Sequence, residues 1–390
     1  MRTLLVPLKN IAVRCGFQEL IERQGASMNR PCITQRGLVL LLVVSTLCPV
    51  LYADFTFGEP VNLRTIIPVL DPARDFINCL SYDGLEMYIH SGQDHDTNLR
   101  VLRRESKDAD WGPPQDLGPI VNTADDSGPS ISADGLTLYF NSNRPGGYGS
   151  WDIYMSKRTT KNDPWGPPVN LGAKVNSPFS EAWPWISMDG LELHFHSCRS
   201  GGYGCADIWV TRRATQDEPW GEAVNLGSVV NGAYEDAGPC ISPDGRLLLL
   251  SSDRTSGYGS SDNWMSRRAN VSDPWQTPVN LGPRVNTPQY NDLARFSPDG
   301  RQMFFTDGVI EDPTTWNNYQ AAILPIVDFN GDKSVDVNDL RELVENWGMD
   351  NSLYDIGPYA WGDGKVDIED LKVFVARWEQ ENAANSGDRQ

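Results

Sequence analysis

Oxygen-bearing side chains recur at alternate positions in one stretch near the end of the chain, "DFNGDKSVDVND". They fall at positions 1, 3, 5, 7, 9 and 12 of a single loop and are Asp328, Asn330, Asp332, Ser334, Asp336 and Asp339. Hard oxygen ligands at this spacing wrap one calcium ion, and Gly331 lets the chain bend between them. The alternative is a solvated acidic loop, but the spacing favours a calcium site.

A second loop of the same kind follows 31 residues later, around "WGDGKVDIED". Its acids match positions 5, 9 and 12 and are Asp363, Asp367 and Asp370. Positions 1 and 3, where ligands belong, hold Tyr359 and Trp361 instead. Asp355 could supply a ligand if this loop is longer than the first. The sequence therefore leaves open whether the second loop binds calcium.

Each loop leads into a segment with helical periodicity, and one side of the first segment carries Leu340, Leu343, Val344 and Trp347. This duplicated loop and helix, from Asp328 to about Trp378, resembles the type I dockerin module. The resemblance implies bound calcium and docking onto a cohesin-like partner protein. Such modules often carry partner-reading hydroxyl residues where this chain has Val337, Asn338, Ile368 and Glu369. Cohesin recognition would therefore use other chemistry.

A second group of acids precedes a recurring Ser-X-Asp-Gly turn by six residues. The acids are Asp75, Asp126, Glu181 and Asp236, and the fifth copy has Asn291. If they lie on inner strands of a ring, they would surround one mouth of its channel, raise one another's pKa values or bind a cation. Paired carboxylates can also hydrolyse glycosidic bonds. These four acids are the weak catalytic candidates of the sequence.

The third copy of the repeat departs most from the others. Trp183 and Trp185 replace small residues of the neighbouring copies, and His194 and His196 replace Tyr139 and Asn141. Two Trp on one face of a strand could stack a sugar ring, so these four residues are the ligand-binding candidates. The alternative is that two large residues fill a gap in the core.

The phrase "NSNRPGGYGSWDIYMSKR" recurs as "HSCRSGGYGCADIWVTRR" and "SSDRTSGYGSSDNWMSRR". An Arg stands eight residues before an Asp in each copy, in the pairs Arg144 and Asp152, Arg199 and Asp207, and Arg254 and Asp262. We expect each pair to meet across a hairpin, a corner that every copy needs. Cys198 and Cys205 flank the second copy and could form a disulfide across it, with two free thiols as the alternative.

These residues must be positioned by a repeat. The Ser-X-Asp-Gly turns begin at five serines spaced by 51, 55, 55 and 55 residues, namely Ser81, Ser132, Ser187, Ser242 and Ser297. Each unit reads as four strands with alternating polarity, which is typical of propeller blades. The fifth unit lacks the "WxxPVNLG" strand, whereas "FGEPVNL" stands alone at Phe57–Leu63. Pairing this segment with the fifth unit would close the ring and remove exposed edges.

The full phrase and the Pro-Asp-Gly turn resemble the WD40-like propeller repeats of the TolB type. The resemblance covers about residues 55 to 326 and implies an all-β fold, here a five-bladed β-propeller. A small α-helical dockerin-like domain follows it. We therefore predict a leader at 1–53, a propeller at 54–326, a calcium-binding domain at 327–380 and a disordered tail at 381–390.

The leader contains an apolar run, "GLVLLLVVSTLCPVLYA", behind two arginines, which is the layout of a secretory signal. Met28 is a candidate true start, and a membrane anchor is the alternative interpretation of the run. Without residues 1–53 the chain has 27 basic and 50 acidic residues, a net charge of −23. Such a surface repels nucleic acid and anionic lipid, and is suited to binding cations.

The sequence thus predicts a secreted, non-catalytic recognition module for a carbohydrate or protein ligand. Its calcium-dependent tail would attach it to a surface or to a polysaccharide-handling complex. The alternatives are a propeller glycoside hydrolase or polysaccharide lyase, and a protein-protein scaffold.

Overall fold

The computed structural model describes residues 55–71, 74–92, 97–309, 312–332, 334–349 and 353–387. The predicted leader, with its apolar run, lies outside the described residues. Within them, no helix has both the length and the apolar character that crossing a membrane requires.

The propeller consists of antiparallel sheets, which we call blades 1 to 5. Blade 1 contains β3 (Asp75–Leu80), β4 (Glu86–Ser91), β5 (Asn98–Arg103) and β6 (Gln115–Asp116). Blade 2 contains β7 (Asp126–Ile131), β8 (Thr137–Ser142), β9 (Asp152–Lys157) and β10 (Val169–Asn170). Blade 3 contains β11 (Glu181–Ile186), β12 (Glu192–Ser197), β13 (Asp207–Arg212) and β14 (Val224–Asn225).

The last two blades follow the same order. Blade 4 contains β15 (Asp236–Ile241), β16 (Leu247–Ser252), β17 (Asp262–Arg267) and β18 (Val279–Asn280). Blade 5 contains β19 (Tyr290–Phe296), β20 (Gln302–Val309), β21 (Asp312–Pro325), and the early strands β1 (Phe55–Phe57) and β2 (Val61–Asn62). A 3₁₀ turn, η1 (Leu63–Thr65), follows β2. The prediction of five blades is confirmed.

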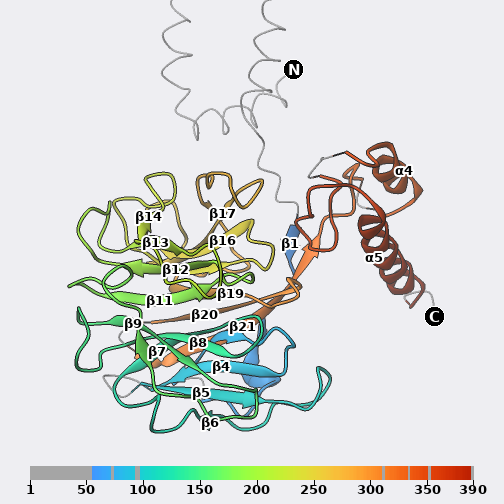
Figure 1. Cartoon of the computed structure of the whole chain (residues 1–390). Coiled ribbons are helices and arrows are strands. Elements are labelled where there is room, and N and C mark those ends of the chain that lie inside the picture. The colour runs from blue at the N-terminus through green and yellow to red at the C-terminus, as the bar shows by residue number, and fades with distance from the viewer. Residues whose placement is uncertain are drawn as a thin grey trace, which may run out of the picture. The chain divides into compact units, whose positions relative to one another are not determined.

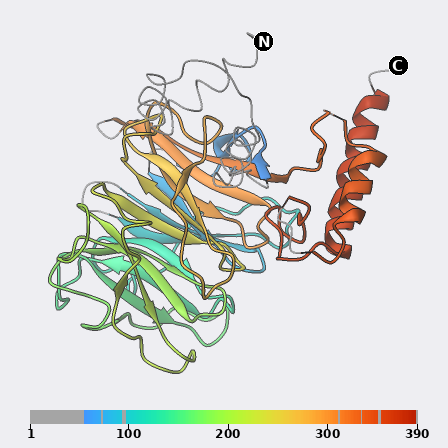
Figure 2. The ribbon, with the colours of Figure 1, turned by 90° about the horizontal axis from the view of Figure 1, so that it is seen from above.

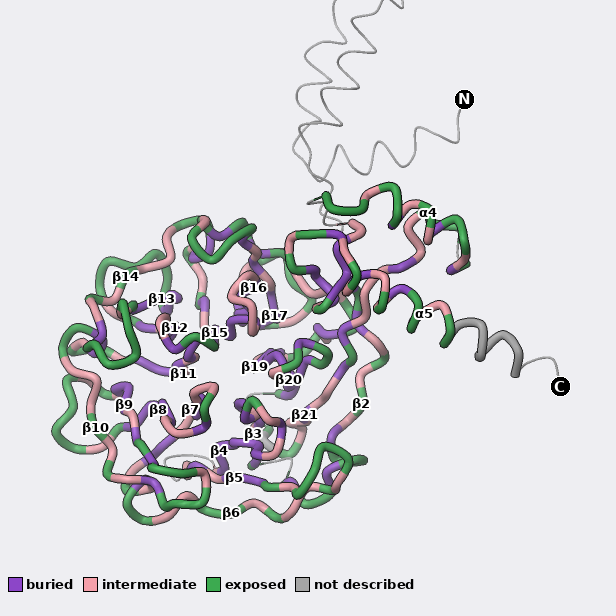
Figure 3. The backbone as a smooth tube through the Cα atoms, turned by 45° about the vertical axis from the view of Figure 1, so that its right-hand side comes forward, coloured by how far each residue is buried: buried purple, intermediate pink, exposed green. Residues whose placement is uncertain are grey.

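The first strands of the blades surround a central axis. Each touches the first strand of the next blade, and β19 returns to touch β3. Figures 1 and 2 show the sheets following one another in chain order, and Figure 3 shows exposed backbone at the rim, near β6, β10 and β14. The axis has an entry end, where the first strands begin, and a turn end, where the Ser-X-Asp-Gly turns follow them.

The N-terminal segment closes the ring, as predicted. Phe57 of β1 lies opposite Ile323 of β21, and Val61 of β2 lies opposite Gln320. Blade 5 therefore takes its outer strands from the start of the chain, and its edge is paired rather than open. In Figure 1 the blue β1 lies beside the orange β21.

Apolar side chains fill the spaces between blades. In the cluster between blades 2 and 3, Tyr139 and Ile153 pack with Leu193, Phe195 and Trp209. One face of each sheet thus packs on the preceding blade and the other face on the next. A single blade could not bury both faces, which is why the unit is repeated.

A repeated Arg–Trp contact secures the rim of four blades. The guanidinium carbon lies 4.3 to 4.5 Å from the ring centroid in Arg104–Trp111, Arg158–Trp165, Arg213–Trp220 and Arg268–Trp275. Each of these arginines also donates to the carbonyl of its turn glycine, which is Gly84, Gly135, Gly190 or Gly245. The Trp of the recurring "WxxP" segment therefore has a structural task in every blade.

The tail contains two helices, α4 (Val337–Glu345) and α5 (Ile368–Gly387), around a small core of their own. Asp336 and Asp339 form a capping box at the start of α4. Helix α5 runs past residue 381, where the sequence favoured a disordered tail. Glu381, Ala383 and Ala384 are good helix formers and continue the helix that begins at Ile368, which accounts for the difference.

Candidate functional site

The acids that precede the turns do not line the axis, and the predicted ring of carboxylates is corrected. Three of them have no exposed surface and pair with the Arg of the repeated phrase. The pairs are Arg144 with Asp126 at 2.7 Å, Arg199 with Glu181 at 3.1 Å, and Arg254 with Asp236. A buried carboxylate held in such an ion pair is out of reach of a substrate.

The other two members of the group are also buried. Asp75 accepts the backbone N–H of Asp71 at 2.8 Å. The side-chain amide of Asn291 donates to the carbonyls of Ser261 and Thr287 at 3.0 and 2.9 Å. All five positions therefore hold the start of a first strand in place.

The Arg and Asp of the repeated phrase do not pair across the hairpin, which corrects a second expectation. Asp152 instead accepts the backbone N–H groups of Tyr148 and Gly149, at 2.6 and 2.9 Å. It also accepts the side-chain amide of Asn170 at 2.7 Å. A side chain on Gly149 would lie 1.6 Å from the carbonyl oxygen of Phe179, so this glycine lets the next blade approach. The Asp shapes the loop, while the Arg reaches back to the first strand.

Cys198 and Cys205 are free thiols and exposed, so the predicted disulfide is not formed. The loop between them is already held by Asp207, which accepts the N–H groups of Tyr203 and Gly204 at 2.6 and 3.1 Å. Blades 2 and 4 build the same loop without cysteine. The shape of the hairpin thus needs no covalent link.

Trp183 has a backbone φ of +53°, in the left-handed region. The corresponding residues of blades 2 and 4 are Gly128 and Gly238, with φ of +61° and +57°. A β-bulge between Ala182 and Trp185 produces this conformation. It costs a bulky residue about 1–3 kcal/mol, and such strain concentrates at functional sites.

Trp183 belongs to a continuous chain of aromatic contacts at the entry end, which we call the aromatic floor. Its members come from blades 1, 3 and 5 and are Trp183, His90, Phe76, Trp316 and Tyr290. Consecutive ring centroids lie 5.2, 4.9, 5.5 and 5.9 Å apart. All but His90 are partly exposed. Because Trp183 of blade 3 touches His90 of blade 1, the floor reaches across the axis.

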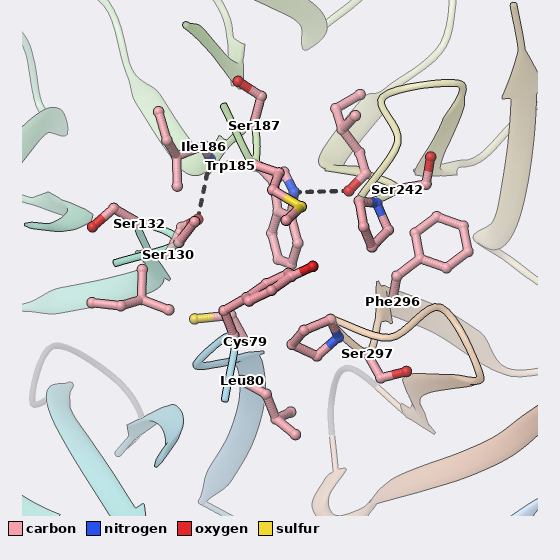
Figure 4. Close-up of a pocket in the computed structure, with 17 residues that line it drawn as sticks. Cys79, Leu80, Ser130, Ser132, Trp185, Ile186, Ser187, Ser242, Phe296 and Ser297 are labelled. Atoms are coloured by element: carbon pink, nitrogen blue, oxygen red, sulfur yellow. Dashed lines mark hydrogen bonds between the residues drawn. The ribbon is translucent and has the colours of Figure 1, made fainter. Parts of the chain in front are cut away.

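Trp185 lies at the other end and does not share a face with Trp183. It stands in a cavity of about 60 Å³ at the turn end, lined by the last residues of the first strands (Figure 4). Its indole Nε1 donates to the carbonyl of Ile241 at 3.1 Å. A cavity of this size is too small for a sugar ring. Trp185 therefore fills the core, as the alternative interpretation proposed.

The two predicted histidines separate as well. His194 is fully buried, its ring nitrogens have no hydrogen-bond partner among the described residues, and burial lowers its pKa to about 3. His196 lies at the entry end, where its Nδ1 accepts the N–H of Gly238 at 3.3 Å. Burial, with a contribution from Arg295, lowers the pKa of His196 to about 4. Of the four predicted ligand-binding residues, Trp183 belongs to the aromatic floor and His196 lies near it. The other two do not.

Arg295 of blade 5 points into the middle of the axis between the two Trp residues. Its guanidinium carbon lies 6.0 Å from the Trp183 ring and 5.6 Å from the Trp185 ring. Its Nη1 donates to the carbonyls of Gly238 and Ala294 at 2.8 and 3.0 Å. Only 3% of the residue is exposed. A cation thus lies directly beneath the aromatic floor.

Polar groups of blades 4 and 5 accompany this cation. Asp292 accepts the Ser251 hydroxyl and, at 2.7 Å, the N–H of Leu293. A Cβ placed on Gly238 would lie 3.4 Å from Asp292 Oδ1, 3.7 Å from Arg295 Nη2 and 3.8 Å from Ser251 Oγ. The missing side chain of Gly238 therefore leaves room for about one methyl group in contact with all three groups.

Further acids lie around the entry end. Burial raises the pKa of Asp292. Burial also raises the pKa of Glu235, with contributions from the nearby charges of Asp253 and Asp292. Glu235 and Asp253 are exposed, and the N–H of Glu235 donates to the Asp253 carboxylate at 2.8 Å. We call Glu235 and Asp253 the rim acids.

Sequence reasoning missed Asp292 and Arg295, although a signal was present. Their counterparts in blade 4 are Ala237 and Cys240, and in blade 2 Ser127 and Ser130. The comparison between copies that singled out blade 3 would have singled out these two charges in blade 5. Phe76, His90 and Trp316 lie in the least regular blades, where the repeat gives no reference.

The two loops of the tail have matching hydrogen bonds. Asp339 Oδ1 accepts the N–H groups of Phe329 and Asn330 at 2.9 and 3.3 Å, and Asp339 Oδ2 accepts that of Asp336 at 2.9 Å. Asp370 does the same with Ile356, Gly357 and Asp367 at 2.6, 2.8 and 2.6 Å. The match aligns Asp355 with Asp328, as a longer second loop requires.

The oxygen-rich donor set of these loops is of the kind that calcium takes. In the second loop, Asp355 and Asp370 are almost fully buried. Burial, with the charges of Asp370 and Asp363, raises the pKa of Asp355 to about 6. In the described part of the chain, no three His, Cys, Asp or Glu residues are grouped closely enough to hold a metal ion. Calcium binding by these two loops is therefore a proposal.

The longer second loop attaches the tail to the turn end of the propeller, through residues 358–362, which we call the tongue. Trp361 packs against Phe55 and Phe296, with ring centroids 5.8 and 5.2 Å apart. Its Nε1 donates to Asp244 at 2.8 Å, and Tyr359 stacks on its other side at 5.1 Å. Tyr359 and Trp361, which interrupt the ligand pattern in the sequence, thus form a docking contact.

Solved structures resemble this chain at low sequence identity. No family model matches the chain, and no curated protein matches it in sequence. A TolB from Agrobacterium tumefaciens is similar at 18% identity and a TM-score of 0.41, over 66% of this chain and 80% of that one. An endo-arabinase from Bacteroides thetaiotaomicron is similar at 18% identity and a TM-score of 0.44, over 70% and 97%. An α-L-arabinofuranosidase from Lactobacillus brevis is similar at 14% identity and a TM-score of 0.45, over 67% and 94%.

Proposed function

We propose that the propeller is a carbohydrate-recognition module that binds its ligand on the aromatic floor. The floor is the observation that carries the proposal, because the apolar faces of sugar rings pack on aromatic faces. Ser127, which accepts the Asn141 amide at 2.7 Å, lies at the same end, and its partly exposed hydroxyl can bond a sugar hydroxyl. Of the four acids that the sequence offered as catalytic, three are enclosed in ion pairs and Asp75 is buried, which favours binding without turnover.

A glycan array probed with the full chain tests this proposal. We expect binding that Trp183→Ala and Phe76→Ala each reduce at least about tenfold, since stacked rings contribute about 0.5–1.5 kcal/mol each beyond their buried area. Trp347→Ala, which removes an exposed Trp of the tail, is the control and leaves binding unchanged. Binding that persists in both floor variants would contradict the proposal.

The strained backbone of Trp183 gives a separate prediction on stability. Trp183→Gly will be more stable than Trp183→Ala by about 1 kcal/mol in the free energy of unfolding, and it will unfold at a higher temperature. The reason is that only glycine accepts a φ of +53° without strain. Thermal unfolding followed by circular dichroism measures the difference. Equal stabilities would mean that the backbone relaxes once the indole is gone.

A glycoside hydrolase is the second candidate, and the acids of the entry end favour it. The raised pKa of Glu235 suits a general acid, and Asp292 lies near enough to contribute to that shift. In this case the chain will release reducing sugar, with a rate that falls on the alkaline side once Glu235 loses its proton. Glu235→Gln would abolish release. Binding with no release in the wild type excludes this candidate.

We further propose that the tail binds calcium and anchors the propeller, as a dockerin-like module on a cohesin-like partner. The spacing of Asp328, Asn330, Asp332 and Asp339 supports the first site, and the alignment of Asp355 with Asp328 supports a second. The leader is proposed to direct export, where free calcium is abundant enough for such loops.

Calcium will stabilise the tail. We expect isothermal titration to show calcium binding that Asp339→Ala abolishes at the first loop. At a calcium concentration about 100 times the dissociation constant, the gain is about 2.7 kcal/mol. Adding a chelator will speed amide exchange in α4 and α5 and leave blades 1 to 3 unchanged. Unaltered exchange in both helices would count against bound calcium.

A further inference from the structure

Arg295 carries a charge that the propeller itself leaves without a close partner. Among the described residues, no ion pair joins its guanidinium to a carboxylate, and its Nη2 and Nε donate to none of them. Burying an unpaired cation is costly, and burial lowers the pKa of Arg295. Structural arginines elsewhere in the ring, such as Arg144 and Arg158, pair with a buried acid.

Asp292, the nearest acid, does not form an ion pair with Arg295. Asp292 Oδ1 already accepts the hydroxyl of Ser251 and the N–H of Leu293. The neighbouring His90 and His196 have pKa values lowered to about 3 and about 4, first by burial, so both are neutral at pH 7. Of Arg295, His90 and His196, only Arg295 therefore carries a positive charge at pH 7.

The guanidinium lies next to Gly238, the position in blade 4 that corresponds to Trp183 of blade 3. Its Nη2 borders the space that Gly238 leaves open, beside Ser251 Oγ. The same guanidinium lies beneath the ring of Trp183. A sugar stacked on that ring would bring a substituent to Nη2 and to the Ser251 hydroxyl together.

We infer that the site recognises a sugar bearing a carboxylate, with Arg295 as the anion anchor and Trp183 as the stacking surface. This inference rests on the proposed carbohydrate function. Arg bonds carboxylates in its plane, and such charge-assisted bonds are about twice as strong as neutral ones. A uronic acid unit supplies both the ring and the carboxylate.

The rim acids restrict the ligand further. Glu235, Asp253 and the net charge of −19 repel a chain in which every sugar is charged. The site therefore selects an isolated uronic acid on an otherwise neutral glycan over a homopolymer of uronic acid.

Titration calorimetry with the full chain and matched probes tests the inference. The probes are a xylotetraose carrying one glucuronic acid, the same oligosaccharide with that carboxyl reduced to an alcohol, and polygalacturonate. We expect the acidic oligosaccharide to bind at least about tenfold tighter than its reduced form, a difference of about 1.4 kcal/mol. Added salt weakens only the acidic probe. Polygalacturonate binds more weakly than the acidic oligosaccharide.

Three variants examine the anchor itself. Arg295→Met removes the charge and makes the two oligosaccharides bind equally, whereas Arg295→Lys retains part of the preference. Asp292→Asn keeps the contact with Ser251 but removes the nearby negative charge, so it strengthens binding of the acidic probe. Because Asp292→Asn is nearly isosteric, it tests the inference even if Arg295→Met fails to fold.

The outcomes separate this inference from the proposed function. Equal binding of the two oligosaccharides by the wild type overturns the acidic preference and leaves carbohydrate recognition in place. An unchanged preference in folded Arg295→Met overturns the role of Arg295. Failure to bind any glycan overturns both, and binding only of a peptide that ends in a free carboxylate would show that the anchor serves a protein ligand.

Discussion

A chain that begins at residue 64 will not form a stable propeller, whereas a chain that begins at residue 54 will fold. The shorter chain lacks β1, β2 and Leu63, whose side chains close blade 5. Phe55, Phe57 and Leu63 are 3%, 7% and 1% exposed. At about 2 kcal/mol for each buried side chain, their loss removes about 6 kcal/mol.

That loss is comparable to the whole stability of a typical domain, which is about 5–15 kcal/mol. The truncation also opens the edge of β21, which pairs with β1 and β2 at Tyr319, Gln320 and 323–325 in the closed ring. An exposed edge of this kind promotes aggregation. We therefore expect both lower stability and self-association.

Circular dichroism, thermal unfolding and size-exclusion chromatography of the two chains measure the effect. A double variant, Phe57→Asp with Leu63→Asp, tests the same closure in a chain of full length. Normal unfolding temperatures and monomeric elution in the shorter chain would show that the ring closes without its N-terminal strands.

Trp361→Ala will release the tail from the propeller. Trp361 is 2% exposed, and it joins the core that contains Phe55 and Phe296. Replacing a buried Trp by Ala costs about 3–5 kcal/mol. The variant also removes the hydrogen bond to Asp244, the strongest polar contact of the tongue with the turn end.

Amide exchange and limited proteolysis will detect the release. We expect faster exchange around Asp244 and Gly300, whose turns the tongue covers, and cleavage between β21 and α4. Trp347→Ala is the matched control, because that Trp is 44% exposed and lies just after the end of α4. Unchanged exchange at both turns in Trp361→Ala would mean that other contacts hold the tail.

The docking of the tail has a consequence for function. The tongue binds the turn end, while the aromatic floor lies at the entry end, so the two contacts use opposite ends of the axis. A partner held by the tail and a glycan held by the propeller would therefore not compete. The tongue also occupies residues of the second loop, which leaves the first loop and α4 as the more accessible part of the tail.

The sequence by itself determined the features that depend on local repetition. The spacing of the five turns predicted the blade number, and the orphan segment at Phe57–Leu63 predicted the closure, because a strand missing at one end reappears at the other. The alternate oxygen ligands from Asp328 predicted the first calcium loop, and that proposal needs no distant contact. In each case the relevant information comes from comparing copies of the repeat or from a single loop.

Only the tertiary structure decided which side chains reach the site. Strict alternation placed Trp183 and Trp185 on one face, but the bulge after Ala182 shifts the register and sends them to opposite ends of the axis. Arg199 was expected to pair with Asp207, but it pairs instead with Glu181 of β11, the first strand of the same blade. The floor joins rings from blades 1, 3 and 5, which are far apart in the chain and meet only because the ring closes. The bulge has no local signature in the sequence, and ring closure, although the sequence predicted it, brings together side chains that no local pattern relates.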